Sequence, residues 1–225
     1  MNDQTRSAST QASIWPPWLA DVEAVLLDMD GTLVDSDAAV ERAWGRWAAE
    51  HGVDASTLAG AMHGRPALAT VRELAPWLDD AAAQQAADRQ IDLQILDVNG
   101  TVPLAGAAEL LGVLDRFGMP WAVVTSANGR LAAGRLGAAG IEPVVLVTVD
   151  DVGAGKPDPG PYLLAASQLG VEPSRCLVVE DSPPGIEAGR RAGARVAALR
   201  GRPADLTIDS LSELAALLAR SARPR

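Results

Sequence analysis

The chain has 225 residues, of which 48% are hydrophobic and 21% charged, as is typical of a globular protein that buries a sizeable core. A formal net charge of −10 argues against a general surface for nucleic acids or anionic membranes, so we expect neither as a partner. Cys176 is the only cysteine, which excludes an intrachain disulfide.

Residues 1–19 start as a polar segment and contain no apolar region of the kind found in secretory signals, so we expect an N-terminal tail. Trp15 and Trp18 could dock this tail on the body of the protein. No apolar stretch in the chain approaches the length needed to span a bilayer. We therefore expect a cytoplasmic protein, and we expect it to be a monomer.

The first predicted element is a buried strand over residues 24–27, which are all apolar. Asp28 and Asp30 follow it. Because alternate residues of a strand share a face, we expect both carboxylates to point the same way. Two such charges repel unless a cation or a shared proton offsets them. This layout suits a carboxylate nucleophile and metal ligand beside a general acid/base, although an acidic turn is the alternative.

Residues 36–102 form a predicted helical insertion. Val40, Trp44 and Trp47 follow helical spacing, as do two later sets of apolar residues, and no strand alternation occurs. A crossover to the next strand needs only about a dozen residues, and the helix predicted over 104–117 already provides one. We therefore expect a small helical module whose tryptophans form its core.

After the insertion, short apolar runs alternate with helical patterns. The runs are 121–125, 144–147, 176–179 and 196–199, and the helices are expected near 104–117, 128–138, 159–169, 183–193 and 210–220. Such alternation predicts a parallel sheet covered by helices on both faces. Ligands bind such sheets outside the carboxyl ends of the strands, and Asp28, Ser126 and Asp181 lie at or just past these ends.

Ser126 and Ala127 follow the second strand and precede a helix. A hydroxyl and backbone N–H groups in this position can bind an anion. A serine that only caps the helix explains the pattern equally well.

Lys156 is the only lysine in the chain, and all other positively charged side chains are arginines. Asp158 and Pro159 after it are typical of a helix N-cap and first helical residue, which would fix the loop. A compact ammonium suits the neutralisation of a carboxylate or phosphate oxygen at close range. A solvent-exposed lysine is the alternative.

Glu180 and Asp181 end the predicted strand that starts at Cys176, opposite Asp28 and Asp30. Together these acids would form an oxygen-rich site. Carboxylates favour Mg²⁺ over zinc, and no cluster of histidine and cysteine exists for zinc. A helix-capping role is the alternative for this pair taken alone.

Taken in order, four motifs resemble those of the haloacid dehalogenase superfamily, in the branch with a helical cap inserted after the first strand. They are Asp28-Met-Asp-Gly-Thr-Leu-Val-Asp35, Thr125-Ser126, Gly155-Lys-Pro157 and Glu180-Asp-Ser182. The resemblance implies an α/β fold with a Rossmann-like parallel sheet as the catalytic core and an all-helical cap. The expected division is a tail over 1–19, a core over 20–35 and 103–225, and a cap over 36–102.

The resemblance also implies roles for individual residues. Asp28 attacks phosphorus and becomes an aspartyl phosphate, while Asp30 protonates the leaving oxygen and later activates water. Ser126, Ala127 and Lys156 hold the phosphoryl group. The implied Mg²⁺ ligands are Asp28, the carbonyl of Asp30 and Asp181, with Glu180 as a further ligand, direct or through water.

The cap residues Glu41, His63 and Arg65 are similar to those in caps of sugar-phosphate and polyol-phosphate phosphatases, including 2-deoxyglucose-6-phosphate and glycerol phosphate types. Pro66 at a first helical position would place Arg65 near the substrate. We therefore expect a Mg²⁺-dependent hydrolase of a small-molecule phosphate ester, a sugar or polyol phosphate. An ordinary turn between helices is the alternative interpretation of this segment.

Other chemistries of the same fold are less consistent with the sequence. Dehalogenases lack the acid that stands here as Asp30, and phosphonate hydrolases use a cap lysine that is absent from residues 36–102. A β-phosphoglucomutase-like enzyme shares the whole core, and Arg65 could replace the cap lysine common in mutases. A catalytically silent phosphometabolite-binding protein should have lost a catalytic residue, and none of the set is missing.

Overall fold

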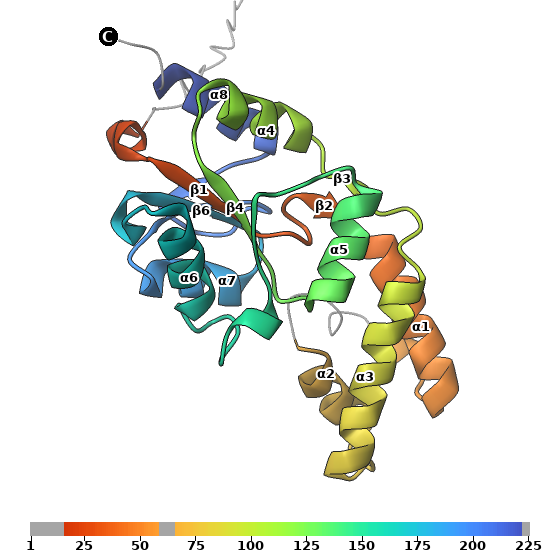
Figure 1. Ribbon diagram of the computed structural model, residues 1–225. Coiled ribbons are helices and arrows are strands. Elements are labelled where there is room, and N and C mark those ends of the chain that lie inside the picture. Colours follow the sequence, from red (N-terminus) through yellow and green to blue (C-terminus); the bar gives the residue numbers. More distant parts are fainter. Residues whose placement is uncertain (1–15, 59–65, 222–225) are drawn as a thin grey trace, which may run out of the picture.

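A six-stranded parallel sheet lies at the centre of the computed structural model, which describes residues 16–58 and 66–221 (Figure 1). The strand order is β5-β4-β1-β6-β7-β8, with every neighbouring pair parallel. The strands are β1 (Ala24–Leu27), β4 (Trp121–Val124), β5 (Val145–Val147), β6 (Cys176–Glu180), β7 (Arg195–Ala198) and β8 (Leu206–Thr207). The five predicted apolar runs are confirmed as strands, and β8 was not predicted.

Helices cover both faces of the sheet because alternate residues of β1 point to opposite sides. Val25 and Leu27 pack in one hydrophobic cluster with side chains of α4 (Ala107–Arg116), α5 (Gly129–Ala138) and α8 (Leu211–Ser221). Ala24 and Leu26 pack in a second cluster against α6 (Gly160–Leu169) and α7 (Pro183–Arg191). Figure 1 shows α4 and α8 on one side of the sheet and α6 and α7 on the other. The predicted fold class is confirmed.

Short 3-10 helices complete the core. They are Pro17–Asp21, Val149–Asp151 and Pro173–Arg175, and a fourth, Ala55–Leu58, lies in the insertion. Leu19, which falls within the expected tail, is buried in the first hydrophobic cluster. No helix in the described part of the chain is long and apolar enough to cross a membrane.

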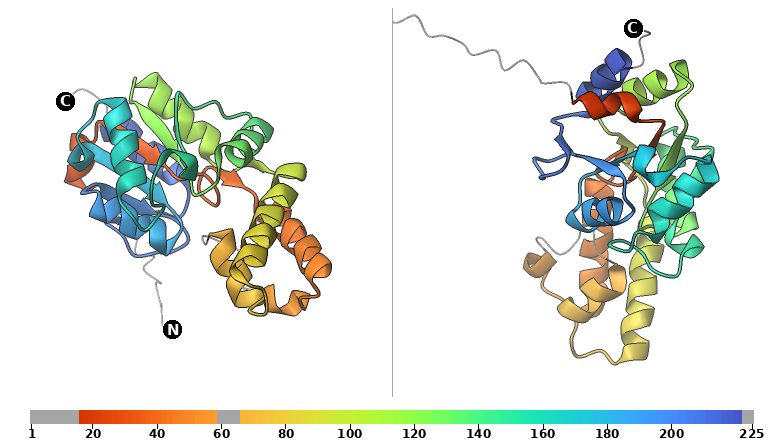
Figure 2. Two further views of the ribbon diagram at one scale, coloured as in Figure 1. Left: turned by 60° about the horizontal axis from the view of Figure 1, so that its bottom comes forward. Right: turned by 90° about the vertical axis from the view of Figure 1, so that its left-hand side faces the viewer.

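The insertion consists of α1 (Asp37–His51), α2 (Ala67–Leu74) and α3 (Asp80–Leu96), which form a separate lobe beside the core (Figure 2). Trp44 and Trp47 are buried in the hydrophobic cluster of this lobe, and the Trp47 indole N–H donates a hydrogen bond of 2.8 Å to the carbonyl of Ala86. The prediction that the tryptophans form its core is confirmed for Trp44 and Trp47, whereas Trp77 is exposed. We call these three helices the cap.

Two connections join the cap to the core, and they pair with each other. β2 (Val34–Asp35) precedes the cap, β3 (Val102–Pro103) follows it, and the two form an antiparallel pair. These two-residue strands are too short to be predicted from sequence alternation. The exact boundaries of the cap at residues 36 and 102 stay a prediction.

Candidate active site

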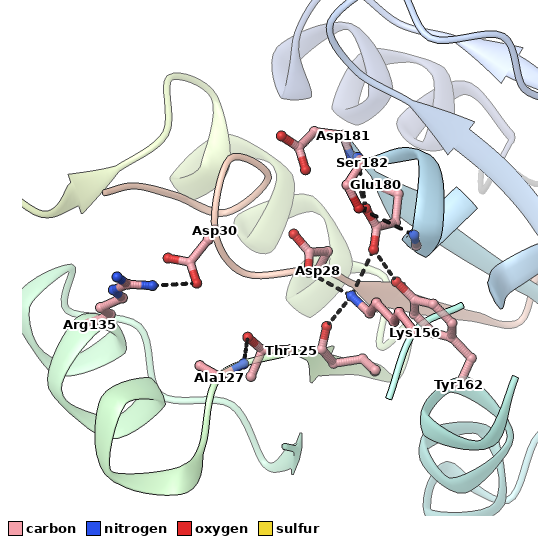
Figure 3. A network of polar contacts seen from close by, with 12 residues as sticks. Asp28, Asp30, Thr125, Ala127, Arg135, Lys156, Tyr162, Glu180, Asp181 and Ser182 are labelled. Atoms are coloured by element: carbon pink, nitrogen blue, oxygen red, sulfur yellow. Dashed lines mark hydrogen bonds and ion pairs between the residues drawn. The ribbon is translucent and has the colours of Figure 1, made fainter. Parts of the chain in front are cut away.

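Four of the predicted site residues meet at the carboxyl ends of the strands (Figure 3). Asp28 follows β1, Glu180 ends β6, Asp181 comes next, and Lys156 lies on the loop between β5 and α6. In the β1–β6 register Leu27 is opposite Val179, so the residues that follow emerge side by side. The β1 strand has β4 and β5 on one side and β6 and β7 on the other, so the order of the strands reverses at β1. Open parallel sheets bind ligands at such a reversal, outside the carboxyl ends of the strands.

The Lys156 ammonium links the acids of this cluster. Its Nζ donates hydrogen bonds to Asp28 Oδ1 at 2.7 Å, to Glu180 Oε1 at 2.7 Å and to the Val124 carbonyl at 2.9 Å. Only 3% of its side chain is exposed. An ammonium has three N–H donors, so every one is used inside the protein. The alternative of an exposed surface lysine is therefore wrong.

Glu180 is fully buried and acts as a hydrogen-bond acceptor on both carboxylate oxygens. Oε1 accepts from Lys156 and from the Tyr162 hydroxyl, and Oε2 accepts from Asp181 N, Ser182 N and Ser182 Oγ. Ser182 in turn caps α7 by accepting a hydrogen bond from Gly185 N. With its lone pairs engaged in this way, Glu180 is better placed to support the site, or to reach a metal through water, than to ligate one directly.

The pKa values of the cluster are displaced because its charges are buried and close together. Burial, with the charges of Glu180 and Asp181, raises the pKa of Asp28 well above its ordinary value, although Lys156 opposes this. Burial and the Glu180 charge raise the pKa of Asp181 to about 6. Burial opposes the charged forms of Lys156 and Glu180. The charges of Asp28 and Glu180 outweigh it at Lys156, whose pKa is raised, and the Lys156 charge and hydrogen bond outweigh it at Glu180, whose pKa is lowered.

The donor set fits Mg²⁺. Asp28, Glu180 and Asp181 offer carboxylate oxygens that all lie within 4.8 Å of one another, and hard oxygen donors are what Mg²⁺ prefers. The chain turns tightly over this group at Gly31, where φ is +80° and a Cβ would lie 2.3 Å from Asp181 Oδ2. Arg200 Nε contacts the same oxygen at 3.1 Å. The ligand assignments themselves stay a prediction.

The expectation that Asp28 and Asp30 point the same way is wrong. β1 ends at Leu27, and the Met29 carbonyl then accepts hydrogen bonds from the N–H groups of residues 32–34, so the chain turns instead of continuing as a strand. In Figure 3 the Asp30 carboxylate is directed toward Arg135 on α5. Its two oxygens are held at 2.7 Å each, Oδ1 by the Ser36 hydroxyl and Oδ2 by Arg135 Nη1.

The loop after β4 presents Ser126 to the same space. Asn128, not Ser126, caps α5, because its side chain accepts a hydrogen bond from Leu131 N. The helix-capping interpretation of Ser126 is therefore wrong. Thr125 Oγ1 accepts a hydrogen bond from Ala127 N, which braces the loop, and Ser126 is exposed to the cavity described next.

A cavity of about 440 Å³ opens above the cluster, between the core and the cap. Asp28, Asp30, Ser126 and Lys156 line its core side, and Val40, Trp44, Gln90, Ile91 and Gln94 line its cap side. Glu41 is exposed and is not among the described lining residues, so the structure does not bring it to the site. His63 and Arg65 lie outside the described residues, and Pro66 is the N-cap of α2 instead of its first helical residue.

Three residues of the site were missed from the sequence. Tyr162, Arg135 and Arg200 contact Glu180, Asp30 and Asp181, respectively. Each partner is distant in the chain, so no local spacing reveals the contact. One signal was available: Tyr162 is the only tyrosine, on the helix directly after the only lysine.

Comparisons with known proteins agree with this geometry. The profile of the haloacid dehalogenase-like hydrolases matches residues 22–193. The chain is 41% identical to hexitol phosphatase A of Escherichia coli, over 80% of this chain and 83% of that protein. It is 37% identical to an N-acetylmuramic acid 6-phosphate phosphatase of Pseudomonas aeruginosa, over 80% and 82%. A solved structure of a putative β-phosphoglucomutase from Thermotoga maritima is 27% identical, with a TM-score of 0.69 and coverage of 88% and 99%.

Gly185→Ala should damage the site directly. A Cβ at Gly185 would lie 1.6 Å from Glu180 Oε1, so the carboxylate must move away from Lys156. We expect the free energy of unfolding to fall by about 3 kcal/mol, with most activity lost. The control is Gly112→Ala on α4, where a Cβ meets nothing within 4 Å; it should raise stability by about 0.5–1 kcal/mol. Equal urea midpoints and activities for the two variants would contradict this account of Glu180.

Stabilisation by Mg²⁺ should depend on pH. The pKa of Asp181, about 6, exceeds the 3.8 of an ordinary aspartate. The folded metal-free protein therefore binds a proton that the unfolded chain lacks between these values, and this contribution to stability is lost as pH rises through 6. Mg²⁺ competes with that proton, so its effect on Tm should be small at pH 5 and large at pH 7.5.

The control is Asp181→Asn, in which we expect the Tm shift to be strongly reduced at both pH values. Calorimetric scans in Mg²⁺ and in chelator measure the effect. A shift that is equal at both pH values, or unchanged in Asp181→Asn, would exclude Asp181 as the proton-linked ligand.

Proposed function

Since the chain belongs to the haloacid dehalogenase-like hydrolase family, we propose that it is a phosphoric monoester hydrolase that acts on phosphorylated sugars or polyols. The observation that carries this proposal is the buried cluster of Asp28, Lys156, Glu180 and Asp181 at the floor of a cavity roofed by the cap. Such a cluster supports attack by a carboxylate on an anionic phosphate ester, because its ammonium and a metal ion would offset the added negative charge.

In the first half-reaction a carboxylate oxygen of Asp28 attacks phosphorus, and the bond from phosphorus to the ester oxygen breaks. Asp30 gives a proton to the departing alkoxide, which is a poor leaving group without it. Lys156 holds Asp28 Oδ1 and so fixes the direction of the nucleophile. Ser126 and the N–H groups of its loop, open to the cavity, would receive the phosphoryl oxygens.

In the second half-reaction Asp30, now ionised, takes a proton from water, and the water oxygen attacks the phosphorus of the aspartyl phosphate. The bond from phosphorus to the Asp28 oxygen breaks, and inorganic phosphate and free Asp28 result. One carboxyl group thus serves as acid and then as base, so the cavity must admit one water after the alcohol has left.

Asp28, the Asp30 carbonyl and Asp181 would hold Mg²⁺, with Glu180 behind them. When bound, the ion supplies positive charge to the phosphoryl oxygens and offsets the repulsion between Asp28 and Asp181. Arg200, which contacts Asp181 at 3.1 Å, fixes the orientation of that carboxylate from the other side.

The cavity supports a small hydroxylated substrate. Its volume of about 440 Å³ lies within the range of small-molecule sites. Among the described lining residues, the cap contributes apolar side chains, the amides of Gln90 and Gln94 and the carboxylate of Asp37, with no cation. Amides suit hydroxyl groups, and the relatives named above are phosphatases of a hexitol phosphate and of a sugar acid phosphate. Contacts of His63 and Arg65 with the substrate stay a prediction.

A phosphosugar mutase is the second candidate, because the Thermotoga maritima structure described above shares the fold and part of the sequence. A mutase must keep its aspartyl phosphate until a second sugar phosphate binds, so it needs a site for that second phosphate. The described part of the cap offers no positive charge to the cavity, which favours the phosphatase.

Asp28→Asn should lower kcat by at least about 10⁴-fold, because an amide does not form the covalent intermediate. The fold should persist, as shown by an unchanged circular dichroism spectrum. Glu23→Gln, at the opposite and exposed end of β1, is the matched control and should retain full activity. Turnover of Asp28→Asn within about tenfold of the parent would remove Asp28 from the mechanism.

Product analysis separates phosphatase from mutase. With β-glucose 1-phosphate and Mg²⁺ we expect phosphorus NMR to show steady release of inorganic phosphate without a bisphosphate activator, because water is the acceptor. The mutase candidate predicts the opposite, namely glucose 6-phosphate accumulating faster than inorganic phosphate.

A further inference from the structure

Arg135 is buried at the boundary between the core and the cap. Only 4% of its side chain is exposed, although it carries a charge. Its Nη1 lies 2.7 Å from Asp30 Oδ2, and its Nη2 donates a hydrogen bond to Gln94 Oε1 on α3. One guanidinium on α5 therefore contacts both the carboxyl group assigned to proton transfer and a helix of the cap.

The contacts continue into the cap. Gln94 Nε2 donates a hydrogen bond of 2.5 Å to Gln90 Oε1, one turn earlier on α3. Asp30, Arg135, Gln94 and Gln90 thus form a line of polar side chains, and all four border the cavity. Two donors of this line, Arg135 Nε and Gln90 Nε2, are buried without a hydrogen-bond partner.

The line specifies one orientation of Asp30. Its carboxylate is held on both oxygens, by Ser36 on one and by Arg135 on the other. A guanidinium is planar and presents N–H groups in fixed directions, so it can satisfy Asp30 and Gln94 together only when α3 is seated against α5. A lysine in its place would keep the charge but lose this two-sided geometry.

We propose that Arg135 is the positioning residue for Asp30, and that Gln94 makes this positioning depend on the seating of the cap. This presupposes the phosphatase activity proposed above. Proton transfer to the leaving oxygen is then efficient only with the cap in place, when the substrate is enclosed. Arg135 itself does not exchange a proton or form a bond.

The chain offers a matched control on the same two helices. Arg130, also on α5, lies 3.9 Å from Asp92 on α3, but 76% of its side chain is exposed and it does not contact Asp30. Arg130→Met therefore weakens a contact between core and cap without changing the contacts of Asp30. Arg135→Met removes the contact to Asp30. Gln94→Leu leaves that contact in place and removes the link to α3, together with an amide that borders the cavity.

The test compares two substrates in pre-steady-state and steady-state kinetics. Glucitol 6-phosphate has an alkoxide leaving group that needs a proton, whereas 4-nitrophenyl phosphate releases a stable phenolate. For Arg135→Met we expect kcat on glucitol 6-phosphate to fall about 10²-fold at nearly unchanged KM, while the first-turnover burst of nitrophenolate remains near the parent rate. Asp30→Asn, measured alongside, should show the same pattern more strongly.

The other variants complete the test. Arg135→Lys should recover part of the lost kcat, Gln94→Leu should lose several-fold, and Arg130→Met should match the parent. In kcat, the double variant Arg135→Met with Gln94→Leu should be no slower than Arg135→Met alone, because Gln94 acts on Asp30 through Arg135. Loss of a contact between the Gln94 amide and the substrate would appear in KM instead. If Arg135→Met does not fold, as judged by circular dichroism, Arg135→Lys and Gln94→Leu carry the comparison.

An equal fall in the rate of aspartyl-phosphate formation from both substrates, or an effect on KM alone, would overturn the positioning role. Losses that multiply in the double variant would overturn the coupling to the cap. Failure of the parent protein to release phosphate from either substrate would instead overturn the proposed function. A leaving-group effect in Asp30→Asn that is absent in Arg135→Met would leave that function standing and reject only Arg135.

Discussion

The contact on which the site depends is that of one buried ammonium with two buried carboxylates. Lys156 lies 2.7 Å from both Asp28 and Glu180, and a third acid, Asp181, stands beside them. Burying such charges is costly unless each is paired and hydrogen-bonded. The surrounding structure meets this requirement through the Val124 carbonyl, the Tyr162 hydroxyl and the N–H groups at the start of α7, with Gly185 leaving room for Glu180. The cluster still carries an excess of negative charge, which is why a divalent cation and a reactive carboxylate are expected there.

The cap adds a second layer of control. In the proposed mechanism the cluster on the core provides the nucleophile. The cap side of the cavity is lined by residues of α1 and α3, with Pro66 and Ala67 at the start of α2. Asp30, the proposed acid/base, lies where these two parts meet, since it contacts Ser36 before α1 and Arg135 on α5. Both connections to the cap run through the antiparallel pair of β2 and β3. A movement of the cap would therefore shift the chain close to Asp30. In the proposed mechanism, hydrolysis of an alkyl ester would therefore depend on the cap in a way that nucleophilic attack alone would not.

Much of this architecture follows from the sequence. Apolar runs predicted the five principal strands, and the ordered motifs pointed to Asp28, Lys156, Glu180 and Asp181 because parallel strands bring their carboxyl ends to one edge. The predicted common face for Asp28 and Asp30 is wrong because β1 ends at Leu27, three residues before Asp30, and the chain turns after Met29. Arg135 and Tyr162 were missed because helix faces, unlike strand ends, reveal a partner only after the helices are packed. Glu41 was predicted as a substrate-binding residue from a loose similarity to the caps of other phosphatases, and the structure leaves its side chain exposed to solvent on α1.

The most direct measurement traps the covalent intermediate. The enzyme is mixed with substrate and Mg²⁺, quenched in acid within milliseconds and reduced with borohydride, which converts an aspartyl phosphate to homoserine. Peptide mass spectrometry should find homoserine at position 28 only when substrate is present. With 4-nitrophenyl phosphate as substrate, the modified fraction should grow if Asp30 is replaced by Asn, because only the breakdown of the intermediate is then slowed. Phosphate release without any modification of Asp28, or with modification of another acid in its place, would contradict the central role assigned to this carboxylate.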